Sequence, residues 1–183
     1  MRVRWRKSLP FEEIKIGVLA LQGAFEKHRE ICEAPSVLVR YVEELDSCDG
    51  LIIPGGESTV IWKQMEEMGF ISALKAFPAP IFGTCAGLII LARLGLLDCE
   101  VERNGYGRQI DSFQASLDFK GVPMASLFIR APRIKSIGKG VQVLMSHEGE
   151  PVAVQQGRYL ASTFHPELTG EKGLHNHFLQ LCS

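Results

Sequence analysis

Cys85 lies in the segment Gly83-Thr84-Cys85-Ala86-Gly87, between a short apolar run and a stretch with helical spacing. The pattern G-x-C-x-G is the thiol form of G-x-S-x-G, which places a nucleophile on a turn between a strand and a helix. At such a helix N-terminus the dipole and unpaired N–H groups favour a thiolate, and the Ala86 N–H can face an oxyanion. A buried core thiol is the alternative, because free cysteine is often buried. The pattern by itself leaves both interpretations open.

The segment FHPEL at 164–168 favours the nucleophile. His165 could accept the Cys85 proton and later give it to a leaving amine. Glu167 lies two residues further on, so in an extended segment its side chain points to the same side as His165. It could orient the imidazole and stabilise its cation. The other histidines are expected at the surface or as satisfied core residues: His28, His147, His175 and His177.

The segment PGGES at 54–58 follows an apolar run and could supply backbone donors. Two glycines let backbone N–H groups approach a ligand closely. Gly55 or Gly56 could therefore complete an oxyanion hole with Ala86, as acyl transfer requires. The alternative is a plain strand-to-helix turn with Ser58 as the helix cap.

Together these segments suggest hydrolysis of an amide through a thioester on Cys85. Arg103 and Arg130 are candidates to bind a substrate carboxylate, because a guanidinium pairs with it through two parallel hydrogen bonds. Ordinary surface arginines are the alternative that composition favours.

Composition excludes several other classes of protein. The 183 residues are enough for one domain, and a net charge of -1 offers no basic excess for nucleic acid. No apolar run approaches the roughly 20 residues that span a bilayer. The five cysteines are odd in number and form no C-x-x-C, which argues against a zinc site or a disulfide framework. We therefore expect a cytoplasmic protein without a metal or cofactor.

Apolar runs and helical periodicity alternate along the first half of the chain, which predicts a mainly parallel sheet covered on both faces. Strands are expected at 16–21, 37–42, 50–54 and 81–82. Helices are expected at 24–33, from Ser58 or Thr59 to 68, at 71–77, 86–94 and 173–181. The strand-like runs at 101–107, 125–131, 141–146, 151–156 and 159–164 predict hairpins and mixed strands. The prediction is one α/β domain at 14–183 after a basic extension at 1–13.

The chain resembles the class I, triad-type glutamine amidotransferases, through GTCAG and HPE in that order. It is more specifically similar to the glutaminase subunits of pyridoxal 5'-phosphate synthase. The more specific segments are GVLALQGAFEKH at 17–28, YGRQIDSF at 106–113 and HEGEPVAV at 147–154. The similarity covers most of the chain from Ile14 onward, and implies a flavodoxin-like three-layer sandwich. The chain departs from the family pattern in the basic extension and in slightly short connections before Val37 and after Ala92.

This resemblance implies that L-glutamine is hydrolysed to glutamate and ammonia, and that the ammonia passes through a tunnel to a synthase (lyase) subunit. It makes Cys85 the nucleophile, His165 the base and Glu167 its orienting acid. The glutamine-binding residues that it implies are Gly56, Glu57, Ser58, Arg103, Ile129 and Arg130. It also implies that segment 22–28 belongs to the docking surface and that the partner arranges the oxyanion hole.

Three other interpretations remain at this stage. One is a different cysteine hydrolase on a similar sheet, against which HPE and the two arginines argue. Another is a glutaminase subunit of a different amidotransferase. The last is a non-catalytic regulatory subunit with the same fold, against which the complete set of Cys85, His165 and Glu167 argues.

Overall fold

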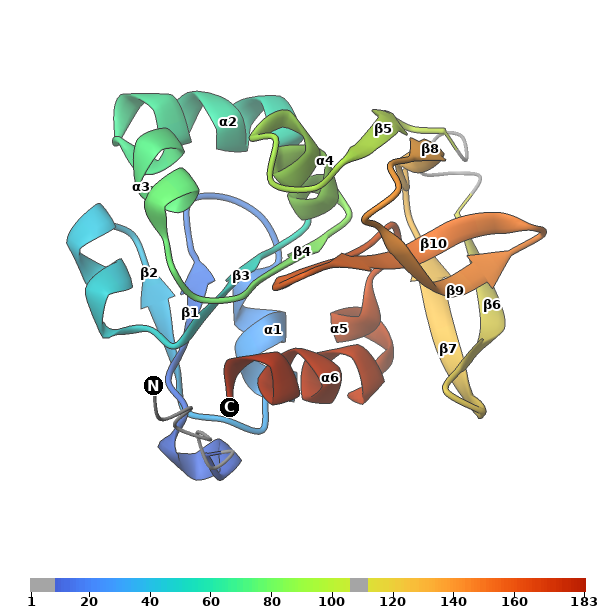
Figure 1. Cartoon of the computed structure of the whole chain (residues 1–183), viewed down its shortest axis with the longest axis horizontal. Coiled ribbons are helices and arrows are strands. Elements are labelled where there is room, and N and C mark those ends of the chain that lie inside the picture. The colour runs from blue at the N-terminus through green and yellow to red at the C-terminus, as the bar shows by residue number, and fades with distance from the viewer. Residues whose placement is uncertain (1–8, 106–111) are drawn as a thin grey trace, which may run out of the picture.

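The computed structural model describes residues 9–105 and 112–183, and in this part of the chain the largest sheet has seven strands (Figure 1). Their spatial order is β2 (Ser36–Val39), β1 (Ile16–Leu19), β3 (Gly50–Ile53), β4 (Ile81–Thr84), β11 (Tyr159–Ser162), β10 (Glu150–Gln156) and β9 (Gln142–His147). The first five strands pair in parallel, and β10 and β9 add antiparallel pairs. The mainly parallel α/β prediction is confirmed.

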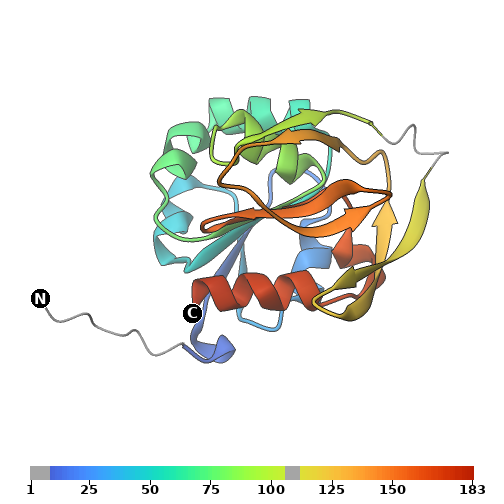
Figure 2. The same ribbon diagram turned by 45° about the vertical axis from the view of Figure 1, so that its right-hand side comes forward.

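Helices cover both faces of this sheet (Figures 1 and 2). One face carries α2 (Ser58–Glu67), α3 (Phe70–Ala76) and α4 (Ala86–Arg93). The other carries α1 (Phe25–Ile31), α5 (Pro166–Thr169) and α6 (Gly173–Cys182). Every residue of β1, β3 and β4 is buried, as expected for strands that lie between two helical layers.

Neighbouring residues of β4 show how the sheet divides the core. Ile81 packs into the cluster under α2, α3 and α4, which contains Ile61 and Leu88. Phe82 points to the opposite face, into the cluster that contains Phe178 of α6. This alternation follows from the two-residue period of a strand, and it explains why a continuous apolar run is needed here.

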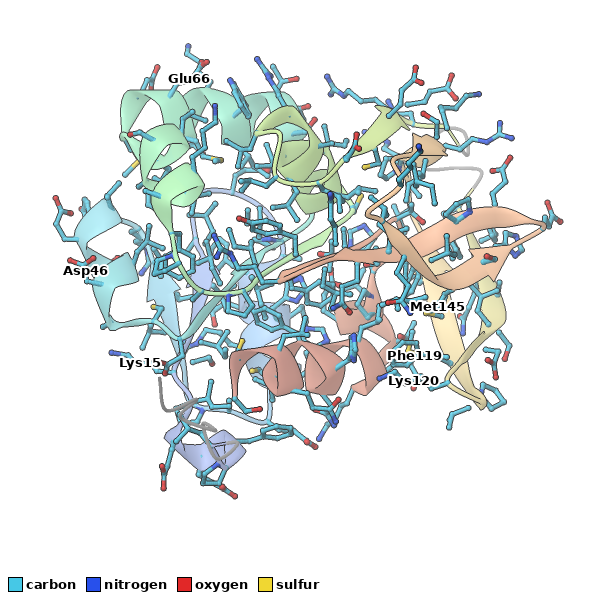
Figure 3. The ribbon with its side chains drawn as sticks, in the orientation of Figure 1. Lys15, Asp46, Glu66, Phe119, Lys120 and Met145 are labelled. Atoms are coloured by element: carbon cyan, nitrogen blue, oxygen red, sulfur yellow. The ribbon has the colours of Figure 1, made fainter. Side chains whose placement is uncertain are left out.

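The remaining strands form two antiparallel pairs beside the main sheet. They are β5 (Cys99–Glu102) with β8 (Arg133–Ile137), and β6 (Phe113–Phe119) with β7 (Val122–Phe128). The tip of the second pair reaches α6, where Phe119 and Lys120 are labelled in Figure 3. The Lys120 Nζ atom lies 2.9 Å from His177 Nδ1. The expected hairpins and mixed strands are thus present, although β6 and β8 were not predicted.

Two local predictions were wrong. The second strand ends at Val39 because the Glu44 carboxylate accepts the N–H groups of Arg40 and Tyr41, at 2.6 and 3.0 Å, which turns the chain into the unpredicted 3-10 helix Val42–Ser47. The cap of α2 is Glu57 instead of Ser58 or Thr59.

The other predicted helices and strands differ at their ends by a few residues. The last two residues of the strand expected at 101–107 lie outside the described part of the chain, as does most of the segment YGRQIDSF. Of the basic extension, residues 1–8 also lie outside it, and Phe11–Glu13 form a 3-10 helix.

A tight turn joins β4 to α4 at Cys85, whose φ is 51° and ψ is −104°. L-residues rarely adopt this conformation, and here the surrounding packing enforces it. A Cβ atom at Gly87 would lie 2.1 Å from the Ile53 carbonyl oxygen of β3. The first turn of α4 therefore approaches the sheet so closely that only glycine fits at this position.

We predict that Gly87→Ala lowers the free energy of unfolding by about 1–3 kcal/mol, because backbone atoms of β3 have to move. Urea unfolding followed by circular dichroism measures this. Gly140→Ala is the matched control, since its nearest contact is the flexible end of Gln156 at 3.2 Å. Equal losses in both variants would contradict the close approach of α4.

Candidate active site

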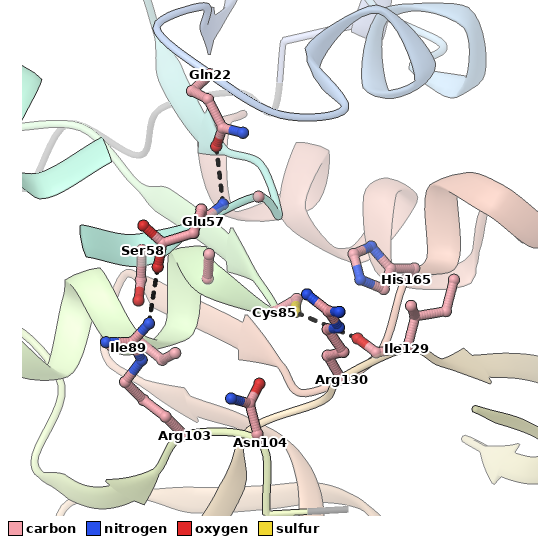
Figure 4. Close-up of a pocket in the computed structure, with 12 residues that line it drawn as sticks. Gln22, Glu57, Ser58, Cys85, Ile89, Arg103, Asn104, Ile129, Arg130 and His165 are labelled. Carbon is pink, nitrogen blue, oxygen red and sulfur yellow. Dashed lines mark hydrogen bonds and ion pairs between the residues drawn. The ribbon is translucent and has the colours of Figure 1, made fainter. Parts of the chain in front are cut away.

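Cys85 is the N-cap of α4 at the carboxyl end of β4, and its backbone N–H donates to the Ser162 carbonyl of β11 at 2.8 Å. The carboxyl ends of β3 and β11 flank this end of β4, because these strands run parallel to it. The residue is 7% exposed, and its Sγ lies 4.0 Å from the Ile129 carbonyl oxygen (Figure 4). The turn thus presents a buried sulfur at the sheet edge where ligands of α/β proteins gather.

His165 and Glu167 meet behind this sulfur. The His165 Nδ1 atom lies 2.7 Å from Glu167 Oε1, and both residues are buried. The expected extended segment is wrong, because α5 begins at Pro166, whose fixed φ suits the first position of a helix. The two side chains still converge, and the His165 N–H donates to the Leu127 carbonyl at 2.9 Å, which anchors the residue to β7.

Charge interactions outweigh burial at this pair. Burial alone lowers the pKa of His165, but hydrogen bonds to Cys85 and Glu167 raise it to about 10. Burial likewise opposes ionisation of Glu167, yet the neighbouring His28 and His165 rings hold the pKa of this carboxyl below its usual value. The arrangement therefore favours an imidazolium at His165 beside the Glu167 carboxylate.

A cavity of about 340 Å³ lies in front of Cys85. It is lined by Gln22, Gly56, Glu57, Ser58, Cys85, Ala86, Ile89, Arg103, Asn104, Ile129, Arg130 and His165. All sequence-predicted site residues lie on this cavity except Glu167, which stands behind His165, and Gly55. A Cβ atom at Gly55 would be 2.5 Å from His165 Cε1 and 3.3 Å from Cys85 Cβ, so Gly55 packs directly against both side chains.

Glu57 and Arg103 form a fixed charged pair in the wall of this cavity (Figure 4). The Glu57 carboxylate accepts the N–H groups of Thr59 and Val60 at the start of α2 and pairs with Arg103 at 2.7 Å. The backbone donors and the guanidinium hold the pKa of Glu57 below its usual value. Arg130 contributes a second guanidinium from a residue with φ of 45°, and forms no ion pair with the described residues.

Comparison with known proteins decides the family. A model of the SNO glutamine amidotransferase family matches residues 18–183. The chain belongs to this family. Pyridoxal 5'-phosphate synthase subunit PdxT of Geobacillus sp. (strain WCH70) is 48% identical over 92% of this chain and 96% of its own length. The subunit of the same name from Anoxybacillus flavithermus (strain DSM 21510 / WK1) is 49% identical, with the same two shares covered.

Solved structures agree with the fold of an SNO glutamine amidotransferase. A crystal structure of a glutamine amidotransferase superposes with a TM-score of 0.86 and 42% identity, over 91% of this chain and 98% of the other. A GMP synthase protein from Thermoplasma acidophilum has a TM-score of 0.72 at 17% identity, over 92% and 94%. The second likeness concerns the fold alone. The predicted amidotransferase-like α/β sandwich and the family resemblance are both confirmed.

Sequence reasoning missed three residues that line the cavity of this SNO family member: Gln22, Ile89 and Asn104. Gln22 follows the end of β1, and its Oε1 accepts the Glu57 N–H at 2.8 Å. This bond ties the loop after β1 to the loop after β3. The position of Gln22 just beyond a buried strand was the available signal, because parallel strands end at one edge.

The four remaining histidines divide into two groups. His28 and His175 are buried, which is one of the two environments expected from the sequence. His147 and His177 are partly exposed. Burial lowers the pKa of His28 to about 4 and that of His175 well below its usual value. His28 is also close to the site, with its Nε2 atom 3.6 Å from Glu167 Oε2.

The described residues show no metal-binding cluster and no helix that could span a membrane. They contain no group of three or more histidine, cysteine, aspartate or glutamate side chains arranged to hold a metal ion. Within residues 9–105 and 112–183, every helix is too short or too polar to cross a bilayer. All five cysteines lie in this part of the chain and have free thiols.

We predict that acid destabilises the protein through His28 and His175, the two buried histidines whose pKa is lowered. Folding lowers the pKa of His28 from 6.5 to about 4. The neutral ring therefore contributes fully to the free energy of unfolding above pH 6.5, and this contribution is lost as the pH falls toward about 4. From His28 alone, the free energy of unfolding should fall by about 2 kcal/mol between pH 7 and pH 5. Urea unfolding at several pH values measures this. His28→Gln, which cannot titrate, should flatten the profile, and coinciding profiles would contradict the assignment.

Proposed function

We propose that the chain is the glutaminase subunit of a pyridoxal 5'-phosphate synthase, and that it hydrolyses L-glutamine to L-glutamate and ammonia. One observation supports this most directly: the buried Cys85 and His165 line a cavity whose wall also carries the Glu57–Arg103 pair, and Glu167 stands behind His165. A cysteine beside a histidine that can hold its proton and give it to a leaving group is suited to acyl transfer. The relatives named as subunits of that synthase supply the substrate and the setting.

In the acylation step, the Cys85 thiolate attacks the side-chain carbonyl carbon of glutamine. The negative charge moves to the carbonyl oxygen, which the Ala86 N–H and an N–H of Gly55 or Gly56 receive. His165 gives its proton to the leaving nitrogen, so that ammonia departs and a glutamyl thioester remains on Cys85.

In the deacylation step, His165 is neutral and takes a proton from a water molecule as that water attacks the thioester. The second tetrahedral intermediate uses the same backbone donors. It collapses to the free acid, whose new carboxyl group loses its proton to solvent to give glutamate, and it returns the sulfur as a thiolate beside a protonated His165. Glu167 stays ionised throughout and keeps Nδ1 protonated, so that Nε2 faces the reacting atoms.

The charged wall selects an amino acid as the substrate. Arg103 and Arg130 are suited to the α-carboxylate, and the Glu57 carboxylate is suited to the α-ammonium group. Gly56, Ser58 and Ile129 complete the cavity around the side chain.

The ammonia would pass to a synthase (lyase) subunit, because release into water would protonate it and lose it to the solvent. The segment from Gln22 to His28 is proposed to form part of the surface on which that subunit docks. The Gln22 side chain accepts the Glu57 N–H from the loop after β3, which also carries the proposed oxyanion donors Gly55 and Gly56. Docking at this segment can therefore change the positions of those donors.

We predict that Cys85→Ala lowers glutamate release by at least about a thousandfold when the synthase subunit is present, because the acyl-accepting atom is absent. A coupled glutamate dehydrogenase assay measures it. Cys99→Ala on β5 is the control and should keep wild-type activity, since its thiol is outside the cavity. Retained activity in Cys85→Ala would favour a non-catalytic role for this chain.

We predict that Arg103→Lys raises the KM for glutamine by about tenfold and changes kcat less, because an ammonium cannot reproduce the two-pronged guanidinium contact. Steady-state kinetics of the complex measures both constants. Lys63→Ala on the exposed face of α2 is the control, and it should leave KM unchanged. A pure loss of kcat would place Arg103 outside substrate binding.

A further inference from the structure

A chain of buried polar side chains runs behind the triad, from α5 to α1 and α6. The second carboxylate oxygen of Glu167, Oε2, has no hydrogen-bond partner among the described residues, although its side chain is fully buried. His28 Nε2 lies 3.6 Å from this oxygen. The same Nε2 lies 3.1 Å from Thr84 Oγ1, and His28 Nδ1 lies 2.9 Å from His175 Nε2. A buried carboxylate oxygen without a nearby donor would be costly, so the proton position on His28 matters.

Donor and acceptor accounting favours one tautomer. If His28 carries its proton on Nε2, the N–H points at Thr84 and Glu167, and Nδ1 accepts the Nε2–H of His175. Within this network, the unprotonated Nδ1 of His175 then lacks a hydrogen-bond partner among the described residues, and Glu167 Oε2 has the His28 N–H nearby at 3.6 Å instead of a hydrogen bond. If His28 instead carries its proton on Nδ1, a lone pair faces the Glu167 carboxylate, and a buried N–H of His175 is left unsatisfied. The second arrangement combines repulsion with a lost hydrogen bond.

We propose that His28 is a positioning residue for the triad: as the Nε2–H tautomer fixed by His175, it directs its ring N–H toward the free oxygen of Glu167. The other oxygen is then held on His165, and the carboxylate cannot rotate away from the imidazole. At 3.6 Å the contact is a charge–dipole attraction, which is strong because both side chains are fully buried. The role rests on the proposed glutaminase, since it acts on the residue that orients the base.

The surroundings of His28 keep it neutral in this role. The groups that face it are Glu167 and His165 around α5, His175 on α6, and Thr84 at the end of β4. Burial and the imidazolium of His165 disfavour a second positive charge, while Glu167 alone favours it. A neutral ring with a fixed tautomer supplies an N–H to Glu167. It does not compete with the His165 imidazolium for the negative charge of this carboxylate.

The first test is spectroscopic and uses the wild-type chain without a substrate. Histidine-selective ¹⁵N labelling and two-bond ¹H–¹⁵N correlation spectra report the protonated nitrogen of each ring at neutral pH. We expect His28 to be protonated on Nε2 alone, and His28→Gln and His175→Phe spectra to assign the signals. Protonation of His28 on Nδ1, or on both nitrogens, would overturn the proposal whether or not the chain is a glutaminase.

The second test is kinetic and uses the complex with the synthase subunit. His28→Leu should lower kcat at least about tenfold and leave the KM for glutamine within about twofold, because the base is misaligned and the cavity wall is intact. His28→Gln, whose amide can donate near the position of Nε2, should recover part of kcat. His177→Leu on α6 is the control, since its ring contacts Lys120 and Gln155 instead.

A merely structural role would give a different pattern. In the wild type, the downfield Nδ1–H resonance of His165 should report the bond to Glu167, and in folded His28→Leu it should move upfield or broaden, whereas in His177→Leu it should not change. An unchanged resonance and kcat in folded His28→Leu would overturn the proposal. Inactivity of the wild type, with the expected tautomer and resonance shift, would count against the proposed function alone.

Discussion

The site depends on the turn that brings α4 against the sheet at Cys85. Its backbone lies at φ of 51° because the helix has to start at once, with Gly87 against the Ile53 carbonyl of β3. This constraint fixes the sulfur relative to three neighbouring parallel strands. Since those strands end at one edge, His165 after β11 and Gly55 after β3 can converge on Cys85 without a long loop. Strain is therefore stored at Cys85, the residue that we propose as the nucleophile, and the packed layers on either side of the sheet hold it there.

Burial makes the electrostatics of this edge effective. Glu167 lies behind His165 and is shielded from water, so its charge acts on the imidazole with little screening. The more exposed pair of Glu57 and Arg103 has a different character. Its geometry comes from backbone N–H groups at the start of α2, and each side chain is about half exposed, at 45% and 52%. The candidate site thus combines a buried centre at Cys85, His165 and Glu167 with a more exposed, preorganised rim that a charged ligand can enter.

The sequence predicts the parts of the site that follow from strand order. Cys85 and His165 could be found because a buried parallel strand precedes each of them, and a parallel sheet brings such ends together. Glu57 was recognised as a site residue, but its capping role was missed, since serine and threonine dominate that position statistically. The carboxylate prevails here because it accepts two N–H groups and also pairs with Arg103, which lies 46 residues away in the sequence. Local propensity contains no information on that third partner.

The partners of His28, like those of Glu57, could not be predicted from the local sequence. The sequence left open whether His28 lies at the surface or in the core, and the structure shows that it is fully buried. Which residues it meets depends on how α1, α5 and α6 pack on one face of the sheet, and no local pattern encodes this. The result is one carboxylate with two imidazoles, at 2.7 and 3.6 Å. The pKa of His165 is raised to about 10, whereas burial lowers the pKa of His28 to about 4. One acid cannot keep two buried rings charged, so the ring that also faces the thiol takes the proton and the other is left to orient the acid.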